Sequence, residues 1–262
     1  MKSRLFIAGI GVLVGARAFA LPASARLFQQ AYGYKVSCLL CHSNGGGSAS
    51  NNYGKTFLRS GANSGAFKKI ESIDSDDDGI PNIREILAKA NPGDKKSTPS
   101  AVGDWLANAG AVFIPQKELE KLFPGHSKFS AIEGSLNAKQ IEFLKLKLGK
   151  DPVDDDKVPT FYFAEKDGKR FAVGQLIAQP RGEGKGLNTG VAVATSGKIL
   201  KVEVLGGSEA KAVNQNTAYL DALKDKTSTT LPPPPADGSS QLIAASVERS
   251  LYLIQAVFGG AK

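Results

Sequence analysis

Hydrophobic and polar residues follow two different patterns along this chain, and the change falls at a polar stretch near residue 100. Before that point, apolar residues recur every three or four positions in short runs, which predicts short helices. These runs are residues 23–31, 51–60, 67–73 and 80–87. Beyond it, most apolar positions alternate with polar ones, which predicts strands. The alternating segments are residues 159–164, 170–179, 189–194 and 199–205.

The second half also contains segments with helical spacing and hairpin signals. Helical segments are expected at residues 116–123, 137–148, 209–224 and 241–258. The polar, glycine-containing turns at residues 166–169 and 195–198 separate neighbouring strands, as in antiparallel hairpins. We therefore predict two domains, a small all-α domain followed by an α+β domain with an antiparallel sheet. The expected division is residues 21–95, a linker at 96–115, and residues 116–262.

Residues 1–20 have the pattern of a cleavable export signal. Lys2 and Arg4 precede an apolar run, and Ala18 and Ala20 are small residues at the two positions that a signal peptidase recognises. Cleavage near Ala20 would give an exported protein, periplasmic in a bacterium. The apolar run is short for a membrane span of about 20 residues, and no later segment is long enough, so no transmembrane segment is expected in the mature chain.

The distribution of charge argues against a nucleic-acid partner. The formal net charge of the whole chain is +8, and the expected signal carries three of the cations and no acidic residue. The remaining lysines are scattered and lack interleaved aromatic residues, so we expect no nucleic-acid binding. A modest positive surplus suits docking to acidic redox proteins.

The motif Cys38-Leu39-Leu40-Cys41-His42 carries the most specific chemistry of the sequence. Two cysteines two residues apart, followed at once by histidine, are the pattern for covalent attachment of a c-type haem, with the histidine as iron ligand. A disulfide, half a zinc site or a thioredoxin-like pair are the alternatives. Zinc would require further ligands, and a thioredoxin-like pair should follow a strand.

The second axial ligand of the iron is less determined. The only methionine is Met1, which leaves with the signal, and the only other histidine is His126. His126 is therefore the candidate for bis-histidine ligation, which gives a lower potential than methionine does. An iron that is open, or weakly ligated by Tyr53, Lys55 or Asn51, is the alternative.

Residues 74–85 match a calcium-binding loop of the EF-hand type. Carboxylates stand at positions one, three and five, glycine at six, a carbonyl donor at seven and a closing glutamate at twelve. The predicted ligands, with an amide at position nine, are Asp74, Asp76, Asp78, Ile80, Asn82 and Glu85. A solvated acidic turn is the alternative. The ion is expected to stabilise the fold, because the carboxylates repel one another without it.

The haem motif, the glycine loop at residues 45–47, Asn52-Tyr53-Gly54 and the calcium loop together resemble a family of exported bacterial monohaem cytochromes with a calcium loop. The resemblance covers residues 25–95. It implies a cytochrome c-like helical domain that carries haem c and transfers electrons to or from redox partner proteins.

Residues 118–258 are similar to the FMN-binding domain family of membrane oxidoreductase subunits. The similarity lies in residues 122–125, 161–169, 189–205 and 209. The family's Ser-Gly-Ala-Thr flavin-attachment sequence is replaced here by residues 237–244, so covalent FMN is not expected. Non-covalent FMN would place its phosphate at Ser239 and Ser240, where a helix begins, or on the glycine-rich residues 181–186. Ordinary capping of the helix is the alternative for the two serines.

The expected function is electron transfer by an exported, calcium-stabilised c-type cytochrome, with an adjacent flavin if one is bound. The alternative is a haem enzyme or sensor whose open iron acts on peroxide or another small ligand. No catalytic residue is assigned, and an electron carrier is favoured over an enzyme.

Overall fold

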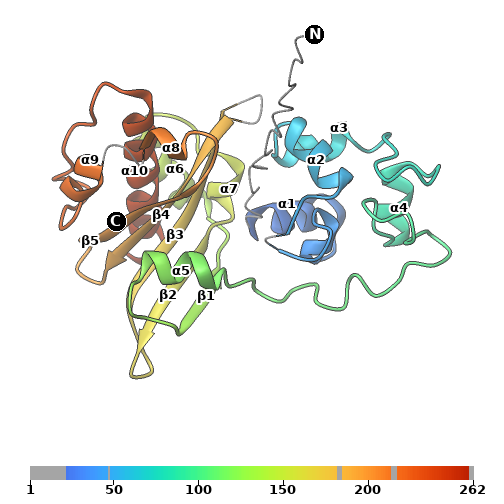
Figure 1. Cartoon of the computed structure of the whole chain (residues 1–262), viewed down its shortest axis with the longest axis horizontal. Coiled ribbons are helices and arrows are strands. Elements are labelled where there is room, and N and C mark those ends of the chain that lie inside the picture. Colours follow the sequence, from blue (N-terminus) through green and yellow to red (C-terminus); the bar gives the residue numbers. More distant parts are fainter. Residues whose placement is uncertain (1–21, 47, 182–184, 214–216, 260–262) are drawn as a thin grey trace, which may run out of the picture.

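The computed structural model describes residues 22–46, 48–181, 185–213 and 217–259. The expected export signal lies outside these residues. Figure 1 shows a group of short helices at one end and a sheet with its helices at the other, connected by a long segment before α5. We call residues 22–111 the helical region and residues 112–259 the sheet region. Among the described residues, no helix combines the length and hydropathy needed to cross a bilayer.

The helical region consists of short elements with well-defined ends. They are α1 (Pro22–Tyr32), the 3₁₀ turn η1 (Cys38–Leu40), α2 (Asn52–Arg59), α3 (Ser64–Lys69) and α4 (Asn82–Ala88). Asn51 caps α2 and Asn63 caps α3, because each side-chain oxygen accepts a backbone N–H of the first turn. Lys89 ends α4 in the left-handed region, with φ of 61°.

An aromatic core holds these helices together. Phe28 on α1 meets Phe67 on α3 edge to face, with ring centroids 5.5 Å apart, and Phe67 stacks on Phe57 of α2 at 4.4 Å. Trp105 belongs to the same core, and its indole N–H donates to the carbonyl of Lys89. The segment expected as a linker is therefore packed on the helical region at Trp105.

The sheet region is built on five antiparallel strands in the order β1-β2-β3-β4-β5. The strands are β1 (Phe129–Glu133), β2 (Thr160–Lys166), β3 (Lys169–Arg181), β4 (Lys185–Ala194) and β5 (Ile199–Gly206). The helices are α5 (Gln116–Leu122), α6 (Ala138–Leu148), α7 (Asp154–Lys157), α8 (Ala210–Val213), α9 (Thr217–Ala222) and α10 (Gly238–Phe258). Sequential neighbours pair throughout; tight turns join β2 to β3 and β4 to β5, as in hairpins, whereas α6 and α7 lie between β1 and β2 in the chain.

Different helices cover the two faces of the sheet. α6 and α10 bury large residues such as Val191 and Val247 on one face. α5 packs on the other face, where Leu122 and Phe123 meet small residues. A Cβ at Gly174 would lie 2.8 Å from the Phe123 ring, so glycine is required there for α5 to sit this close.

The two regions are in contact through Arg26 of α1. Its guanidinium donates to Thr160 and pairs with Glu133 at 2.7 Å, and it also donates to the carbonyl of Val158. Ser64 of α3 donates to Asp154 of α7. The contact therefore joins α1 and α3 to the edge of the sheet and to α7.

The α+β composition and the antiparallel sheet are confirmed, whereas the division into two domains stays a prediction. β1 was not predicted. Of the helix expected at 209–224, the structure describes α8 and α9, and residues 214–216 between them lie outside the described part. Leu87, in the apolar run that predicts a helix at residues 80–87, is 74% exposed.

Candidate haem-attachment and calcium sites

The haem motif forms the turn η1, which the preceding Ser37 caps through its hydroxyl. The amides of Cys41 and His42 both donate to the carbonyl of Cys38, at 3.3 and 3.0 Å. This tight turn presents the two cysteines and the histidine from a single short segment. Both cysteines are free thiols.

Burial raises the pKa of both thiols of the motif, that of Cys41 to about 12. Redox-active pairs of the thioredoxin type depend on a lowered cysteine pKa and a preceding strand, and this motif has neither. The geometry therefore disfavours the thioredoxin-like alternative.

Two asparagine amides fix the backbone of the motif. Asn51 donates to the carbonyls of Leu39 and Leu40 at 3.2 and 3.1 Å, and Asn91 donates to Leu39 at 3.1 Å. α2 approaches so closely that a Cβ at Gly54 would lie 2.3 Å from the carbonyl oxygen of Cys41. Asn51 was considered only as a weak iron ligand, and neither amide was predicted to hold the backbone of the motif, because long-range bonds to a backbone carbonyl leave no spacing pattern in a sequence.

His42 is held in one tautomer. Its side chain is buried, and Nδ1 lies 2.7 Å from the carbonyl of Ser48. Because a carbonyl only accepts, Nδ1 of the neutral ring must carry the proton, which leaves the lone pair of Nε2 for a metal. Metal-binding histidines in proteins are oriented in this way.

The glycine loop lies against the motif. A Cβ at Gly46 would be 3.1 Å from the ring of Phe113 and 3.3 Å from the sulfur of Cys38. Phe113, from the segment before α5, was not predicted as part of this site. Gly47 lies outside the described residues.

His126 is not brought to the haem motif by any contact of the described residues. It follows α5, and its ring packs on Phe171 of β3 with centroids 4.5 Å apart. The three weaker candidates for the second iron ligand are also in environments that do not favour ligation. Asn51 is fully engaged in the hydrogen bonds above, Lys55 is exposed, and Tyr53 is fully buried with no partner for its hydroxyl among the described residues.

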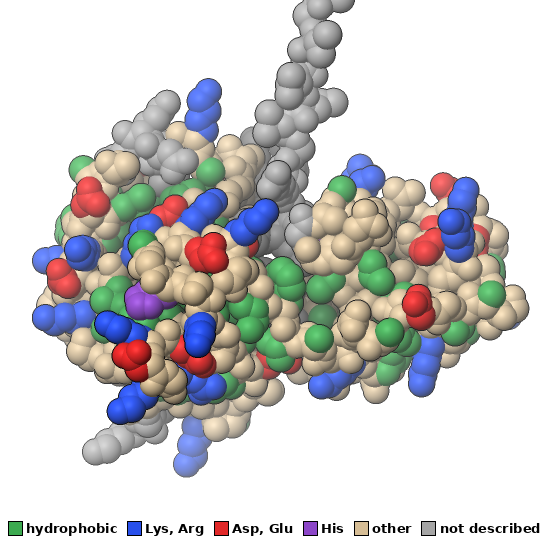
Figure 2. Space-filling model, turned by 60° about the horizontal axis from the view of Figure 1, so that its bottom comes forward, with side chains coloured by type: hydrophobic (Ala, Val, Ile, Leu, Met, Phe, Trp, Pro, Cys, Tyr) green, Lys and Arg blue, Asp and Glu red, His purple; other side chains and the backbone are tan. Residues whose placement is uncertain are grey.

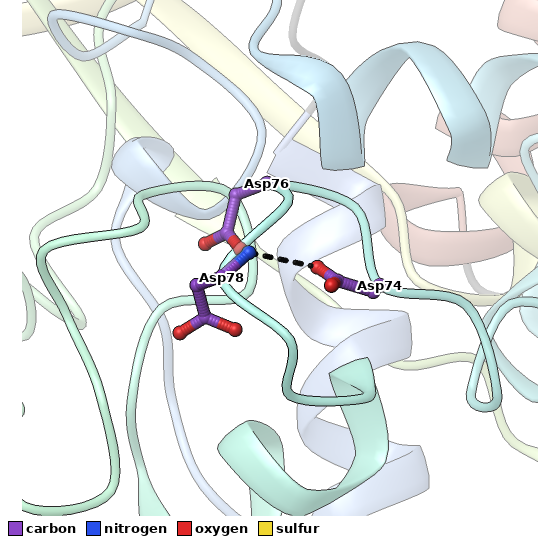
Figure 3. A group of neighbouring side chains, drawn as sticks. All are labelled: Asp74, Asp76 and Asp78. Atoms are coloured by element: carbon purple, nitrogen blue, oxygen red, sulfur yellow. Dashed lines mark hydrogen bonds between the residues drawn. The ribbon is translucent and has the colours of Figure 1, made fainter.

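The calcium loop adopts a closed conformation before α4. Asp74 accepts from the amides of Asp77, Asp78 and Gly79 at 2.8 to 3.3 Å. Asp77 and Gly79 take positive φ values of 64° and 90°, which produces the sharp turn. The carboxylates of Asp74, Asp76 and Asp78 then converge, with ligand oxygens within 4.8 Å of one another (Figure 3).

Several carboxylate oxygens in this loop are buried without a partner. Both oxygens of Asp76 and of Glu85, and one of Asp78, make no hydrogen bond to the described residues. Glu85 is 0% exposed. Burial, and then the charges of Asp76, Asp78 and Asp74, raise the pKa of Glu85 to about 8, and burial likewise raises the pKa of Asp76 to about 6. Unpaired buried oxygens of this kind are costly, and a divalent cation would satisfy them.

The other two predicted calcium ligands, Asn82 and Ile80, make hydrogen bonds to nearby residues of the protein. The amide of Asn82 donates to the carbonyl of Ile70 and to Ser75, and its oxygen accepts from the Ser75 amide at 3.2 Å. Asn82 therefore ties the loop to α3 in the metal-free structure, and its role as a calcium ligand stays a prediction. Ile80 donates its amide to Asp78 at 2.7 Å, and its carbonyl stays a predicted ligand.

The predicted flavin-phosphate position is occupied by a side chain of the protein. Asp237 caps α10, and its carboxylate accepts from the amide of Ser240 at 2.8 Å. A phosphate there would meet the Asp237 carboxylate and a Ser240 amide that is already bonded, which counts against the placement at Ser239 and Ser240; the placement stays a prediction. In the other predicted phosphate loop, residues 182–184 lie outside the described part of the chain.

No protein-family model, curated protein or solved structure matches this chain.

Proposed function

We propose that this chain is an exported electron-transfer protein that carries a covalently bound c-type haem beside a structural calcium ion. Cys38 and Cys41 would form the two thioether bonds, and Nε2 of His42 would ligate the iron. Bound haem supplies a one-electron redox centre. The observation that carries the proposal is the hydrogen bond from Nδ1 of His42 to Ser48, because it presents Nε2 as a metal ligand.

The arrangement of the three side chains argues for haem over zinc. Zinc requires sulfur and nitrogen ligands that converge within bonding distance of one point. In the part of the chain that the structure describes, three converging ligand atoms occur only in Asp74, Asp76 and Asp78. A haem needs no such convergence, since its cysteines attach at the edge of the porphyrin and its histidine at the centre.

The protein's own residues perform three tasks in this proposal. Ser48 orients the imidazole and increases its basicity as a ligand. Asn51 and Asn91 hold the peptide between the cysteines, so that the spacing of the sulfurs is fixed. The positive net charge of the chain favours acidic redox partners.

The calcium part of the proposal is supported by the unpartnered oxygens of Asp76 and Glu85. Asp74, Asp76, Asp78 and Glu85 supply hard oxygen donors, which is the ligand set that calcium prefers. The chain also connects this loop to the haem motif, because α4 leads directly to Asn91. The ion would therefore stabilise the segment that holds the Leu39 carbonyl.

The proposal is tested with protein produced in a host that has haem-attachment machinery and an export pathway. We expect a mass equal to the mature polypeptide plus one haem, and an absorption spectrum that survives denaturation and extraction. Replacing both cysteines, C38S/C41S, should give polypeptide free of haem. S43A is the matched control, because Ser43 is exposed beside the motif and contributes no ligand.

A haem enzyme or sensor is the second candidate, and the environment of His126 favours it. With His126 on Phe171 and no methionine beyond Met1, the sixth position of the iron would be open. A high-spin spectrum of the resting ferric protein, unchanged in His126→Ala and shifted by added cyanide, would support this candidate. A low-spin spectrum that is lost in His126→Ala would support bis-histidine electron transfer instead.

A further inference from the structure

The sheet region contains a pocket of about 580 Å³, far along the chain from the proposed haem and calcium residues. Its floor is apolar and comes from β2, β3, β4 and α10, with Phe163, Val173, Val193, Leu251 and Ile254. The volume falls in the range of about 300 to 1,000 Å³ typical of small-molecule sites. The pocket lies at the C-terminal end of α10, whereas Ser239 and Ser240 lie at its beginning, so the two positions are separated by most of a helix about 30 Å long.

The rim of the pocket supplies unused hydroxyl groups. The turn between β4 and β5 contributes Thr195 and Ser196, and the segment before α10 contributes Thr227, Ser228 and Thr229. Thr227 bonds to its neighbours Thr229 and Thr230. The hydroxyls of Thr195, Ser196 and Ser228 make no hydrogen bond to the described residues, so they can serve a ligand.

One charged side chain lines the described pocket, and it is positive. The guanidinium of Arg170 lies 4.5 Å from the centroid of the Phe163 ring. Its Nε donates to Ser130 at 3.3 Å. Neither of its terminal nitrogens bonds a described residue, and it forms no ion pair in the described part of the chain. Because no aspartate or glutamate lines the pocket, the site attracts an anion at the Arg170 side.

Aromatic surface lines the same pocket. Phe258 is 47% exposed, although it meets Phe161 and Phe163 edge to face with centroids 4.9 and 5.8 Å apart. A large exposed aromatic ring beside an apolar floor favours a flat aromatic partner. The anionic group of such a ligand should face Arg170, because the carbonyls that end α10 would repel it.

We propose that this pocket binds a small aromatic anion, a molecule with a flat apolar ring system and one carboxylate or sulfonate. The rings would lie against Phe163 and Phe258, and the anionic group would take the two free N–H groups of Arg170. The rim hydroxyls would bind polar substituents on the rings. This binding site is independent of the haem and calcium proposals.

The probe is 8-anilinonaphthalene-1-sulfonate, an aromatic sulfonate whose fluorescence rises in apolar surroundings, titrated into the mature full-length protein. We expect saturable binding to one site. Arg170→Gln should weaken the affinity about tenfold, the loss of one charge-assisted contact. Lys166→Gln, on the same hairpin but outside the pocket, is the matched control and should leave the affinity unchanged.

Two further measurements distinguish binding in the pocket from unspecific binding. The uncharged analogue N-phenyl-1-naphthylamine should bind with an affinity that Arg170→Gln does not change. Gln255→Trp, at an exposed lining position on α10, should fill the pocket and abolish binding of both probes, while circular dichroism and the melting temperature show that the fold is retained. Equal binding of the sulfonate to the native protein, Arg170→Gln and Gln255→Trp would overturn the proposal, as would a titration that does not saturate.

Discussion

Replacing Glu85 by glutamine should stabilise the metal-free protein and remove its response to calcium. Glu85 is fully buried, and both carboxylate oxygens lack a partner among the described residues. In the metal-free state its pKa is raised from 4.5 to about 8, chiefly by burial and then by Asp76, Asp78 and Asp74. A neutral amide of the same shape avoids this cost but cannot bind the ion as a carboxylate does.

The sign of the pH dependence follows from the raised pKa of Glu85. Between pH 4.5 and about 8 the folded metal-free protein keeps a proton that the unfolded chain has released. Its stability is therefore complete below pH 4.5 and is lost as the pH rises through 8. At about 1.4 kcal/mol for each pH unit, the loss is roughly 5 kcal/mol, and Asp76 adds to it at lower pH because its own pKa is raised to about 6.

Calcium should reverse this dependence, because the ion favours the ionised carboxylates. For a site with an affinity of about 0.1 mM, calcium at 100 times that concentration would stabilise the fold by about 2.7 kcal/mol. In a chain of this length that corresponds to a rise in melting temperature of roughly 5 to 10 °C. Magnesium should give a smaller shift, since it loses its water ligands reluctantly.

The assay is thermal unfolding between pH 5 and 8.5, with chelator or with calcium, for the native protein, Glu85→Gln and Glu71→Gln. Glu71 is the matched control, because it is partly exposed and lies outside the predicted ligands. Above about pH 7, beyond the raised pKa of Asp76 of about 6, we expect a falling melting temperature with rising pH only for native protein and Glu71→Gln in chelator. Equal destabilisation of Glu85→Gln with and without calcium would refute the reasoning.

Two more substitutions test the packing of the haem motif. Gly54→Ala places a Cβ 2.3 Å from the backbone oxygen of Cys41, which cannot move aside, so we expect unfolding in urea to show a loss of stability of about 3 kcal/mol or more. In the control Gly65→Ala, the new Cβ meets only Asn63 at 3.4 Å, so this variant should be neutral or stabilised by about 0.5 to 1 kcal/mol. Equal effects of the two substitutions would contradict the packing. Asn91→Ala leaves the Leu39 carbonyl with one donor and should cost about 1 to 2 kcal/mol, measured in the same way; an unchanged midpoint would show that Asn91 is dispensable.

Local patterns in the sequence were sufficient to predict the elements that bury one face against a core. β2 to β5 follow the predicted alternation, and α1 and α2 follow the predicted helical spacing, because one face of each packs on a core. β1 was missed because its five residues stand alone after a loop and hydrogen-bond only to β2. Leu87 is exposed because a short helix at the end of the helical region buries few positions, here Asn82, Glu85 and Ile86.

The candidate site was predictable where its residues are adjacent in sequence. The spacing of Cys38, Cys41 and His42, and of the three loop aspartates, is visible directly. The supporting contacts come from distant segments, as with Asn91 and Phe113, and only the fold brings them to the motif. Asn82 stands in register with a ligand position, and its hydrogen bonds to Ile70 and Ser75 could not be predicted, because a sequence pattern does not show which way an amide points.

The most direct test of the account is intact mass spectrometry, together with the absorption spectrum, of the mature chain exported from a host that attaches haem. The account predicts one haem for each polypeptide, resistant to acid extraction, with a spectrum that changes in His42→Ala while the mass of the attached group remains. A mature polypeptide of bare mass, with no iron and no visible absorption in such a host, would contradict it.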